Sequence, residues 1–342
     1  MTEARNPDAT AIPVSVITGF LGSGKTTLLK ALISHPEMGE TAVIINEFGE
    51  VGLDHLLVRK IDEDIVLLNS GCLCCSVRGD LITALREIFL KRVRGDVPEF
   101  ARAVIETTGL ADPAPVIHTL MTDPLIGARY RLDGVIATVD AVLGNGQLDG
   151  HTEAVKQAAM ADRIVLTKCD LAPVADIEFL RKRLVSLNPA APILAADHGN
   201  VDPAALFGTG LYDPKTKTAD VEGWLNEEAY RHHHDAHAQD VNRHDDHIRS
   251  FCIMLDEPIS WDRFQQWMEI VQSTRGESLL RIKGILNVEG EARPVAVHGV
   301  QHVFHPPAAL GEWPSADRRS KIVFITRDLS QAVIEQALRA AT

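Results

Sequence analysis

The chain has 342 residues, which suggests two domains at roughly 100–200 residues per domain. Lys and Arg number 34 against 47 Asp and Glu, and the net charge of −13 argues against binding to a nucleic-acid phosphate backbone. No apolar run is long enough to span a bilayer, and the polar first ten residues are unlike a signal peptide. The composition therefore predicts a cytoplasmic globular protein that binds neither a membrane nor nucleic acid.

The first 200 residues alternate short β-branched runs with helical patterns. Continuous apolar strands separated by helices indicate a mostly parallel sheet covered on both faces, a doubly wound α/β domain over residues 1–205. The expected strands are Ile12–Thr18, Thr41–Asn46, Ile65–Leu68, Ala101–Glu106, Gly134–Val139 and Arg163–Thr167. Helices are expected between them, among them residues 25–34, Asp80–Arg94 and Asp176–Leu187.

Residues 206–247 are rich in Gly, Pro, Asp and His and predict a linker. After it, residues 248–342 predict a smaller α+β domain. Its expected strands are Ile248–Leu255, Leu279–Val288, Pro294–His305 and Lys321–Thr326, and its expected helices are Ser260–Ser273 and Ser330–Ala340.

Residues 19–26 (GFLGSGKT) match the G-x-x-x-x-G-K-[ST] phosphate-binding loop. The motif lies between a predicted strand and a predicted helix, as this loop requires. Its N–H groups converge on phosphate at a helix N-terminus. Lys25 is predicted to reach the β- and γ-phosphates, and the Thr26 hydroxyl to bind Mg²⁺. The nucleotide-binding residues expected here are Gly22, Ser23, Gly24, Lys25, Thr26 and Thr27.

Glu106 ends a predicted strand and begins the sequence ETTG (106–109). If the strand that ends at Glu106 lies beside the strand that leads into the P-loop, the Glu106 carboxylate would hold Mg²⁺ through water or orient the attacking water. We therefore assign Glu106 and Lys25 to catalysis. The Gly109 N–H is a candidate donor to the γ-phosphate, which would make the following loop respond to hydrolysis.

Residues 167–170 (TKCD) follow a strand at the place where guanine-reading P-loop proteins carry Asn-Lys-x-Asp. The Asp170 carboxylate can accept from guanine N1–H and the N2 amine, a pair that adenine does not offer. Lys168 can lie along the base and ribose. Thr167 replaces the Asn and weakens one polar contact. The motif favours GTP over ATP.

Cys72, Cys74 and Cys75 place three thiols within four residues. In a chain predicted to be cytosolic, such a cluster is more often a metal site than a disulfide. Thiolates bind Zn²⁺ and similar ions, and three leave a fourth position open, which suits transfer. Glu50, in the sequence NEFGE (46–50), is a candidate oxygen ligand.

A second tract suited to metals lies in the linker, where six histidines fall within sixteen residues. We expect His232, His233, His234 and His237 to collect or buffer metal weakly, because flexible imidazoles bind Zn, Ni, Cu or Co with variable geometry.

The chain resembles the CobW-like family of metal-handling GTPases. The resemblance rests on TGFLGSGKTT (18–27), NEFGE (46–50), GCLCC (71–75), ETTGLADP (106–113) and TKCD (167–170), which occur in the family's order. It implies a GTPase domain that dimerises in response to nucleotide, a CobW-type C-terminal domain, and delivery of Zn²⁺ or Co²⁺ to client proteins. It also implies that Lys25 and Thr26 bind phosphate and Mg²⁺, that Glu106 belongs to the hydrolytic site, and that the three cysteines bind metal.

The sequence thus predicts a GTP-hydrolysing metallochaperone that couples the thiol site to its nucleotide switch. Two other hypotheses stay open. One is a P-loop kinase or ATPase whose thiols are structural, although the sequence shows no lid-like Arg cluster after the P-loop domain. The other is a non-catalytic zinc store built on the His tract and the thiols.

Overall fold

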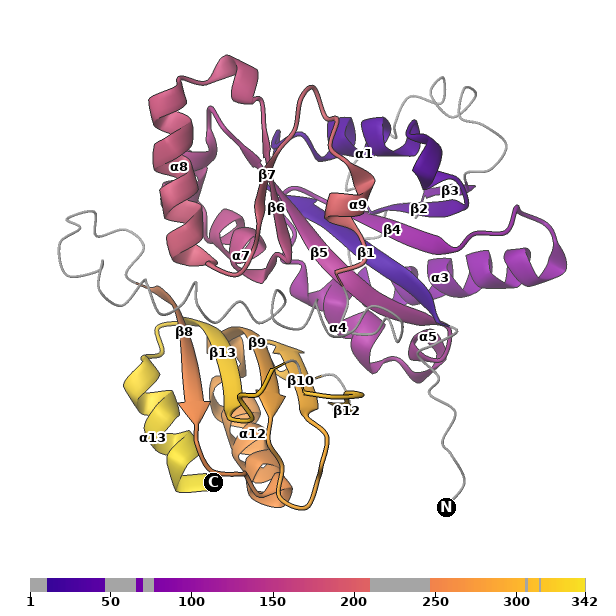
Figure 1. Cartoon of the computed structure of the whole chain (residues 1–342). Helices are drawn as coiled ribbons and strands as arrows, with labels where there is room; N and C mark the ends of the chain where they lie inside the picture. Colours follow the sequence, from indigo (N-terminus) through magenta and orange to yellow (C-terminus); the bar gives the residue numbers. More distant parts are fainter. Residues whose placement is uncertain are drawn as a thin grey trace. The chain divides into compact units, whose positions relative to one another are not determined.

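The computed structural model describes residues 11–46, 66–69, 77–209, 247–304, 307–313 and 315–341 (Figure 1). Contacts divide the chain into two compact units, one holding a seven-stranded sheet and the other a six-stranded sheet. None of the described helices is long and apolar enough to cross a lipid bilayer.

The first unit contains a seven-stranded sheet in the order β3-β2-β4-β1-β5-β6-β7, and every neighbouring pair of strands is parallel. Its strands are β1 (Ile12–Gly19), β2 (Thr41–Asn46), β3 (Val66–Asn69), β4 (Arg102–Thr107), β5 (Tyr130–Asp140), β6 (Arg163–Thr167) and β7 (Ile193–Ala195). Its α-helices are α1 (Lys25–Ile33), α3 (Val77–Arg94), α4 (Ala114–Thr122), α5 (Pro124–Gly127), α6 (Gly144–Gly150), α7 (Thr152–Met160), α8 (Val174–Leu187) and α9 (Pro203–Leu206). Short 3-10 turns cover η2 (Pro36–Met38) and η3 (Cys169–Leu171).

Helices cover both faces of this sheet. On one face, Leu28 and Leu32 of α1 are buried in one apolar cluster with sheet residues such as Ile17 and Val104. On the other face α3 packs on α4 and α4 on β5, and the Tyr130 hydroxyl donates to the Leu85 carbonyl at 3.0 Å. Because both faces are covered, the strands are apolar on both sides and show no alternation. The predicted α/β architecture is confirmed.

The second unit contains an antiparallel sheet in the order β11-β10-β9-β13-β8, with β12 pairing β10. Its elements are β8 (Ile248–Leu255), α12 (Trp261–Arg275), η4 (Gly276–Ser278), β9 (Leu279–Leu286), β10 (Val295–Val300), β11 (Val303–Phe304), β12 (Ala308–Ala309), β13 (Ser320–Arg327) and α13 (Gln331–Ala341). Aromatic side chains form the centre of its core, where Phe264 and Trp267 of α12 pack against Phe324 of the sheet. The α+β prediction for this part is confirmed.

One predicted strand was wrong. The sequence predicts a single strand over residues 294–305, but the chain turns back at Gln301, whose φ is 53°, and Val300 pairs with Val303. The segment is therefore a tight hairpin, and apolar residues in both arms continue the same pattern across the turn.

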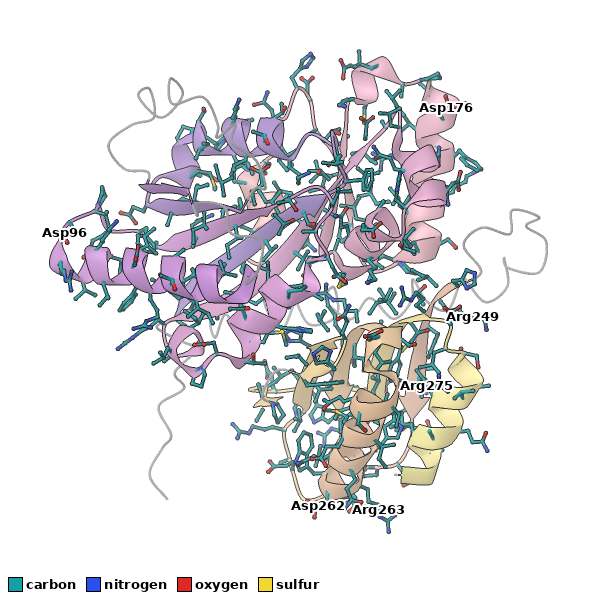
Figure 2. The ribbon with its side chains drawn as sticks, turned by 180° about the vertical axis from the view of Figure 1, so that it is seen from behind. Asp96, Asp176, Arg249, Asp262, Arg263 and Arg275 are labelled. Carbon is teal, nitrogen blue, oxygen red and sulfur yellow. The ribbon has the colours of Figure 1, made fainter. Side chains whose placement is uncertain are left out.

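Several charged residues lie on the outside of the two units. Figure 2, the view from behind, labels Asp96 and Asp176 on the first unit and Arg249, Asp262, Arg263 and Arg275 on the second. All six side chains are exposed. Such solvated charges stabilise little and carry no site by themselves.

Candidate functional site

The P-loop connects the end of β1 at Gly19 to the start of α1 at Lys25. Gly22 and Gly24 adopt φ values of 72° and 90°, a region that glycine occupies without steric cost. The Ser23 N–H donates to the Phe20 carbonyl at 3.1 Å, which curls the loop over the helix N-terminus. A Gly-rich turn of this kind at a helix N-terminus is the arrangement that binds phosphate through backbone N–H groups.

Lys25 lies inside this curl and is only 9% exposed. Its ammonium group donates to the carbonyl oxygens of Gly19 at 2.8 Å and Phe20 at 3.1 Å. A buried ammonium held by carbonyl dipoles is a fixed positive charge. The side chain is thus held where the sequence predicts a phosphate partner.

Thr26 and Glu106 come together from segments 80 residues apart, and the Thr26 hydroxyl donates to Glu106 Oε1 at 2.8 Å. This happens because β4 pairs directly with β1, and Glu106 lies opposite Ile17 near the carboxyl end of both strands. Glu106 is 5% exposed. A hydroxyl and a carboxylate are the oxygen ligands that Mg²⁺ uses beside phosphates, so this donor set fits Mg²⁺. The neighbouring Thr27 side chain is exposed.

Lys168 crosses over the P-loop from the end of β6. Its Nζ donates to the Gly22 carbonyl at 2.8 Å and pairs with Asp140 at 2.5 Å. Asp140 is fully buried at the end of β5, and it also accepts the N–H groups of Val142 and Leu143. Asp140 therefore fixes the lysine and the chain that enters α6.

Thr167 and Asp170 have different surroundings although both belong to the predicted base-reading sequence. The Thr167 hydroxyl is buried and donates to the Ser23 carbonyl at 2.8 Å, so this side chain holds the P-loop. Asp170 has 46% of its side chain exposed and lies 3.9 Å from Nε2 of His198. Its carboxylate is accessible to a ligand.

His198 follows β7 and adopts a φ of 51°. Its Nδ1 lies 2.7 Å from a carboxylate oxygen of Asp197. The hydrogen bond to Asp197 raises the pKa of His198, and the charges of Asp197 and Asp170 add to this effect. The adjacent Gly199 (φ 88°) lies against the Thr27 carbonyl, so this loop borders the start of α1.

Gly109 lies directly against the P-loop. A Cβ at this position would come within 2.7 Å of the backbone nitrogen of Leu21, a distance that only glycine allows. The loop that follows Glu106 therefore contacts the phosphate-binding loop. A segment that responds to the γ-phosphate must lie this close to it.

The predicted metal ligands Glu50, Cys72, Cys74, Cys75, His232, His233, His234 and His237 all lie outside the described residues. Within the part of the chain that is described, no three His, Cys, Asp or Glu side chains form a group that could hold a metal ion. Burial raises the pKa of the Cys169 thiol, which disfavours its reactive thiolate. The zinc site stays a prediction.

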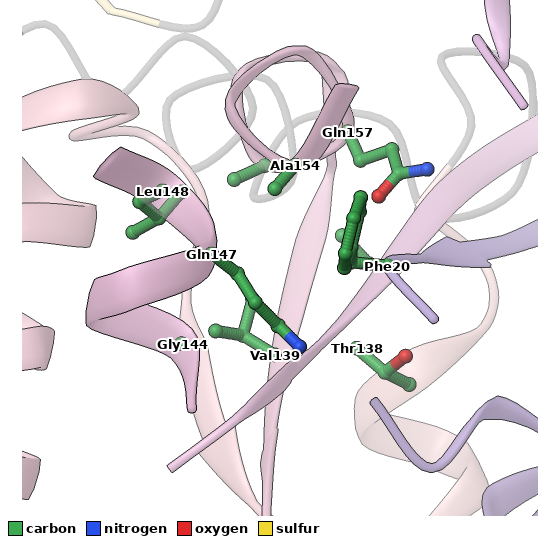
Figure 3. Close-up of a pocket in the computed structure, with 10 residues that line it drawn as sticks. Phe20, Thr138, Val139, Gly144, Gln147, Leu148, Ala154 and Gln157 are labelled. Atoms are coloured by element: carbon green, nitrogen blue, oxygen red, sulfur yellow. The ribbon is translucent and has the colours of Figure 1, made fainter. Parts of the chain in front are cut away.

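Two polar residues beside the P-loop were missed by the sequence reasoning. Asp140 could have been found, because it is an acid at the carboxyl end of a predicted strand, where ligands bind in parallel sheets. Gln157 carries no such signal, since it lies inside a helix and belongs to no motif. Its burial, with 1% exposure, is known only from the fold. Figure 3 places Gln157 and Gln147 around a small hollow next to Phe20.

Comparison with known families gives two matches that together cover most of the chain. Residues 13–195 match the model described as CobW/HypB/UreG, nucleotide-binding domain, and residues 248–342 match the cobalamin synthesis protein CobW C-terminal domain. The chain belongs to this family. Residues 13–195 are thus a CobW-type nucleotide-binding domain, and the predicted resemblance is confirmed.

Individual relatives agree over nearly the whole length. The chain is 36% identical over 332 residues to the zinc chaperone YjiA of Escherichia coli (strain K12), covering 96% of this chain and 97% of that protein. It is 30% identical to the zinc chaperone CobW of Pseudomonas aeruginosa, covering 96% and 91%. The crystal structure of the Zn(II)-bound YjiA GTPase superposes with a TM-score of 0.70 at 31% identity, covering 97% of this chain and 99% of that one.

Proposed function

We propose that this chain is a GTP-hydrolysing zinc chaperone, in which a thiol site at Cys72, Cys74 and Cys75 is coupled to the nucleotide switch and passes zinc to a metal-dependent client protein. The names of its CobW-type relatives support zinc and GTP as ligands. They also favour this function over a P-loop kinase and over a passive zinc store.

The register of the sheet is the observation that supports coupling between the thiol site and the nucleotide site. Ile45 on β2 pairs with Glu106 on β4 and with Asn69 on β3, so the three strands end at one edge of the sheet. With neighbouring strands about 4.8 Å apart, the end of β3 lies roughly 10 Å from that of β4. Cys72 follows Asn69 by only three residues, which span at most about 10 Å. This supports a thiol site whose position depends on the segment beside Glu106.

GTP is bound by the P-loop, and its base is read by Asp170 with Lys168 along its face. Mg²⁺, when bound by Thr26, neutralises developing charge on the phosphates. Glu106 lies beside that position and orients the attacking water. Hydrolysis then changes what the 106–109 segment contacts, which alters the geometry of the thiol site.

Zinc is held as cargo by three thiolates, with Glu50 as the candidate fourth ligand. The same geometry accommodates Co²⁺, so cobalt is a second cargo to be tested. Free thiolates of this kind need a reducing compartment, which makes the cytoplasm the proposed place of action. The histidines at 232, 233, 234 and 237 would collect metal for the thiol site.

The P-loop face also supports a nucleotide-dependent homodimer. Leu21 in the P-loop and Leu110 in the adjacent turn are 53% and 57% exposed. Exposed apolar residues beside a nucleotide site are a typical docking surface. A second copy that covers both side chains only when GTP orders the turn would make the assembly depend on nucleotide.

The proposal is tested by titrating Zn²⁺ and Co²⁺ into the full chain with Mg²⁺ and either GDP or a non-hydrolysable GTP analogue. We expect zinc affinity to differ at least about fivefold between the nucleotides, because binding at coupled sites is reciprocal. Cys74→Ser abolishes that difference while GDP affinity stays unchanged, and Cys252→Ser serves as the matched thiol control. Equal zinc affinities in both nucleotide states refute the coupling.

A further inference from the structure

Gln157 is a polar side chain buried in α7, with 1% exposure. Its Nε2 donates to two backbone carbonyls outside the helix, those of Gly109 at 3.2 Å and Ala111 at 3.0 Å. Burying an N–H donor is costly unless it is hydrogen-bonded, so the Nε2 group and the two carbonyls hold each other in place.

The segment that Gln157 holds is the turn after Glu106. The Ala111 N–H donates to the Thr108 carbonyl at 3.1 Å and closes this turn. Peptide groups are planar, so fixing the carbonyls of Gly109 and Ala111 also fixes the direction of the N–H groups that follow them. Since Gly109 lies against Leu21, the orientation of the turn is set at the P-loop itself.

A second contact from α7 reaches the same loop. Lys156, next to Gln157 in the chain, pairs with Asp112 at 2.8 Å. The other carboxylate oxygen of Asp112 accepts the Ala114 N–H at the start of α4. From α6, Gln147 donates to the Leu21 carbonyl at 3.3 Å. Helices α6 and α7 thus contact the P-loop and the adjacent turn, respectively, and hold the two segments next to each other. Gln147 and Gln157 both line one hollow (Figure 3).

We propose that Gln157 is a positioning residue for GTP turnover: it holds the 108–111 turn against the P-loop so that the turn discriminates GTP from GDP. This inference rests on the proposed GTPase activity. Gln157 does not touch the nucleotide in this scheme, and it acts through the backbone of Gly109 and Ala111. Its loss therefore affects the triphosphate state and spares binding of the diphosphate.

The test measures kcat and KM for GTP and the affinity for a fluorescent GDP in the full chain. Gln157→Leu keeps the size of the side chain and removes both hydrogen bonds. Two such bonds correspond to roughly a 5- to 150-fold effect, which we expect as a fall in kcat and in the preference for GTP over GDP. GDP affinity is expected to change less than about twofold, and Gln266→Leu, the same change at an exposed position of α12, leaves all values unchanged.

Gln157→Glu supplies a readout that a merely structural role would not produce. A carboxylate facing two carbonyl oxygens is repelled, whereas a carboxylic acid donates to one of them. Turnover of this variant relative to wild type should rise as the pH falls from about 8 to about 6, because burial raises the pKa of the introduced carboxyl. The Gln157→Leu variant has no group to titrate and shows no such recovery.

Three results would overturn the inference. One is wild-type turnover and nucleotide preference in Gln157→Leu. The second is an equal loss of GDP and GTP affinity, which marks a general structural role, and the third is a Gln157→Glu variant without pH-dependent recovery. If Gln157→Leu does not fold, Gln157→Asn, too short to reach both carbonyls, must still lower kcat. Absence of GTP turnover in the wild-type chain is a different outcome, since it refutes the proposed function itself.

Discussion

Thr167→Val tests whether the first residue of the TKCD sequence holds the P-loop or reads the base. Valine is β-branched like threonine and carries a methyl group in place of the hydroxyl. In the native chain that hydroxyl donates to the Ser23 carbonyl at 2.8 Å, and the side chain is 5% exposed. The substitution removes this hydrogen bond with little change in volume.

The expected loss of stability follows from the burial of this contact. Removing one partner and leaving a buried carbonyl unsatisfied costs about 1–3 kcal/mol. For a folding unit of this size each kcal/mol lowers Tm by roughly 2–4 °C, so we expect a fall of about 2–12 °C. Thr274→Val, at an exposed position of α12, is the matched control, because its hydroxyl donates to the Ile270 carbonyl of its own helix, where the freed carbonyl remains near solvent. Its cost should stay below about 0.5 kcal/mol.

Thermal unfolding is measured without nucleotide, and GTP, GDP and ATP compete for a fluorescent GDP. A loosened P-loop weakens all three nucleotides by a similar factor, because every one of them presents phosphates to the same N–H groups. The ratio of GTP to ATP affinity should therefore not change. Unaltered stability together with a changed GTP-to-ATP ratio would refute the reasoning and make Thr167 a base-reading residue.

Two further predictions concern the base-reading edge. Asp170→Ala should lower GTP affinity about 10- to 100-fold and leave ATP affinity unchanged, because hydrogen bonds to a charged group contribute about 1.5–3 kcal/mol. Competition binding measures both affinities, and Asp176→Ala, at an exposed position, is the control. An equal loss of ATP affinity in Asp170→Ala contradicts this prediction. The pKa of His198 should lie above 6.5 in NMR titrations and fall toward 6.5 in Asp197→Asn, because the Asp197 hydrogen bond is its main cause. The raised pKa favours the folded state below pH 6.5 and this contribution is lost as the pH rises through the folded-state pKa, so the stability difference between wild type and Asp197→Asn should narrow with rising pH. An unshifted wild-type pKa would contradict this account.

The P-loop was predictable because its geometry is local. One strand, glycines that permit positive φ, and one helix start make the whole motif, and all lie within residues 12–33. The pairing of Thr26 with Glu106 was predictable as well, although 80 residues separate them. It needed only the assumption that the strand ending at Glu106 neighbours the strand leading into the P-loop.

The hairpin over residues 295–304 was not predictable from periodicity. Both arms carry apolar residues, and the reversal occurs at Gln301, a residue type that gives no turn signal. The role of Thr167 was equally hidden. In sequence it stands where a base contact is expected, but in the fold its hydroxyl meets the Ser23 carbonyl, 144 residues away.

By itself, the sequence determined the parallel α/β domain, the phosphate-binding loop and the family, because each depends on short-range patterns of apolar residues, glycines and charged groups. Tertiary structure decided which polar groups hold that loop and the turn beside it. Gln157 meets Gly109 across 48 residues, and Asp140 meets Lys168 across 28. Such contacts depend on which strands and helices become neighbours, and a buried amide or carboxylate selects its partner only after the sheet has brought the two segments together.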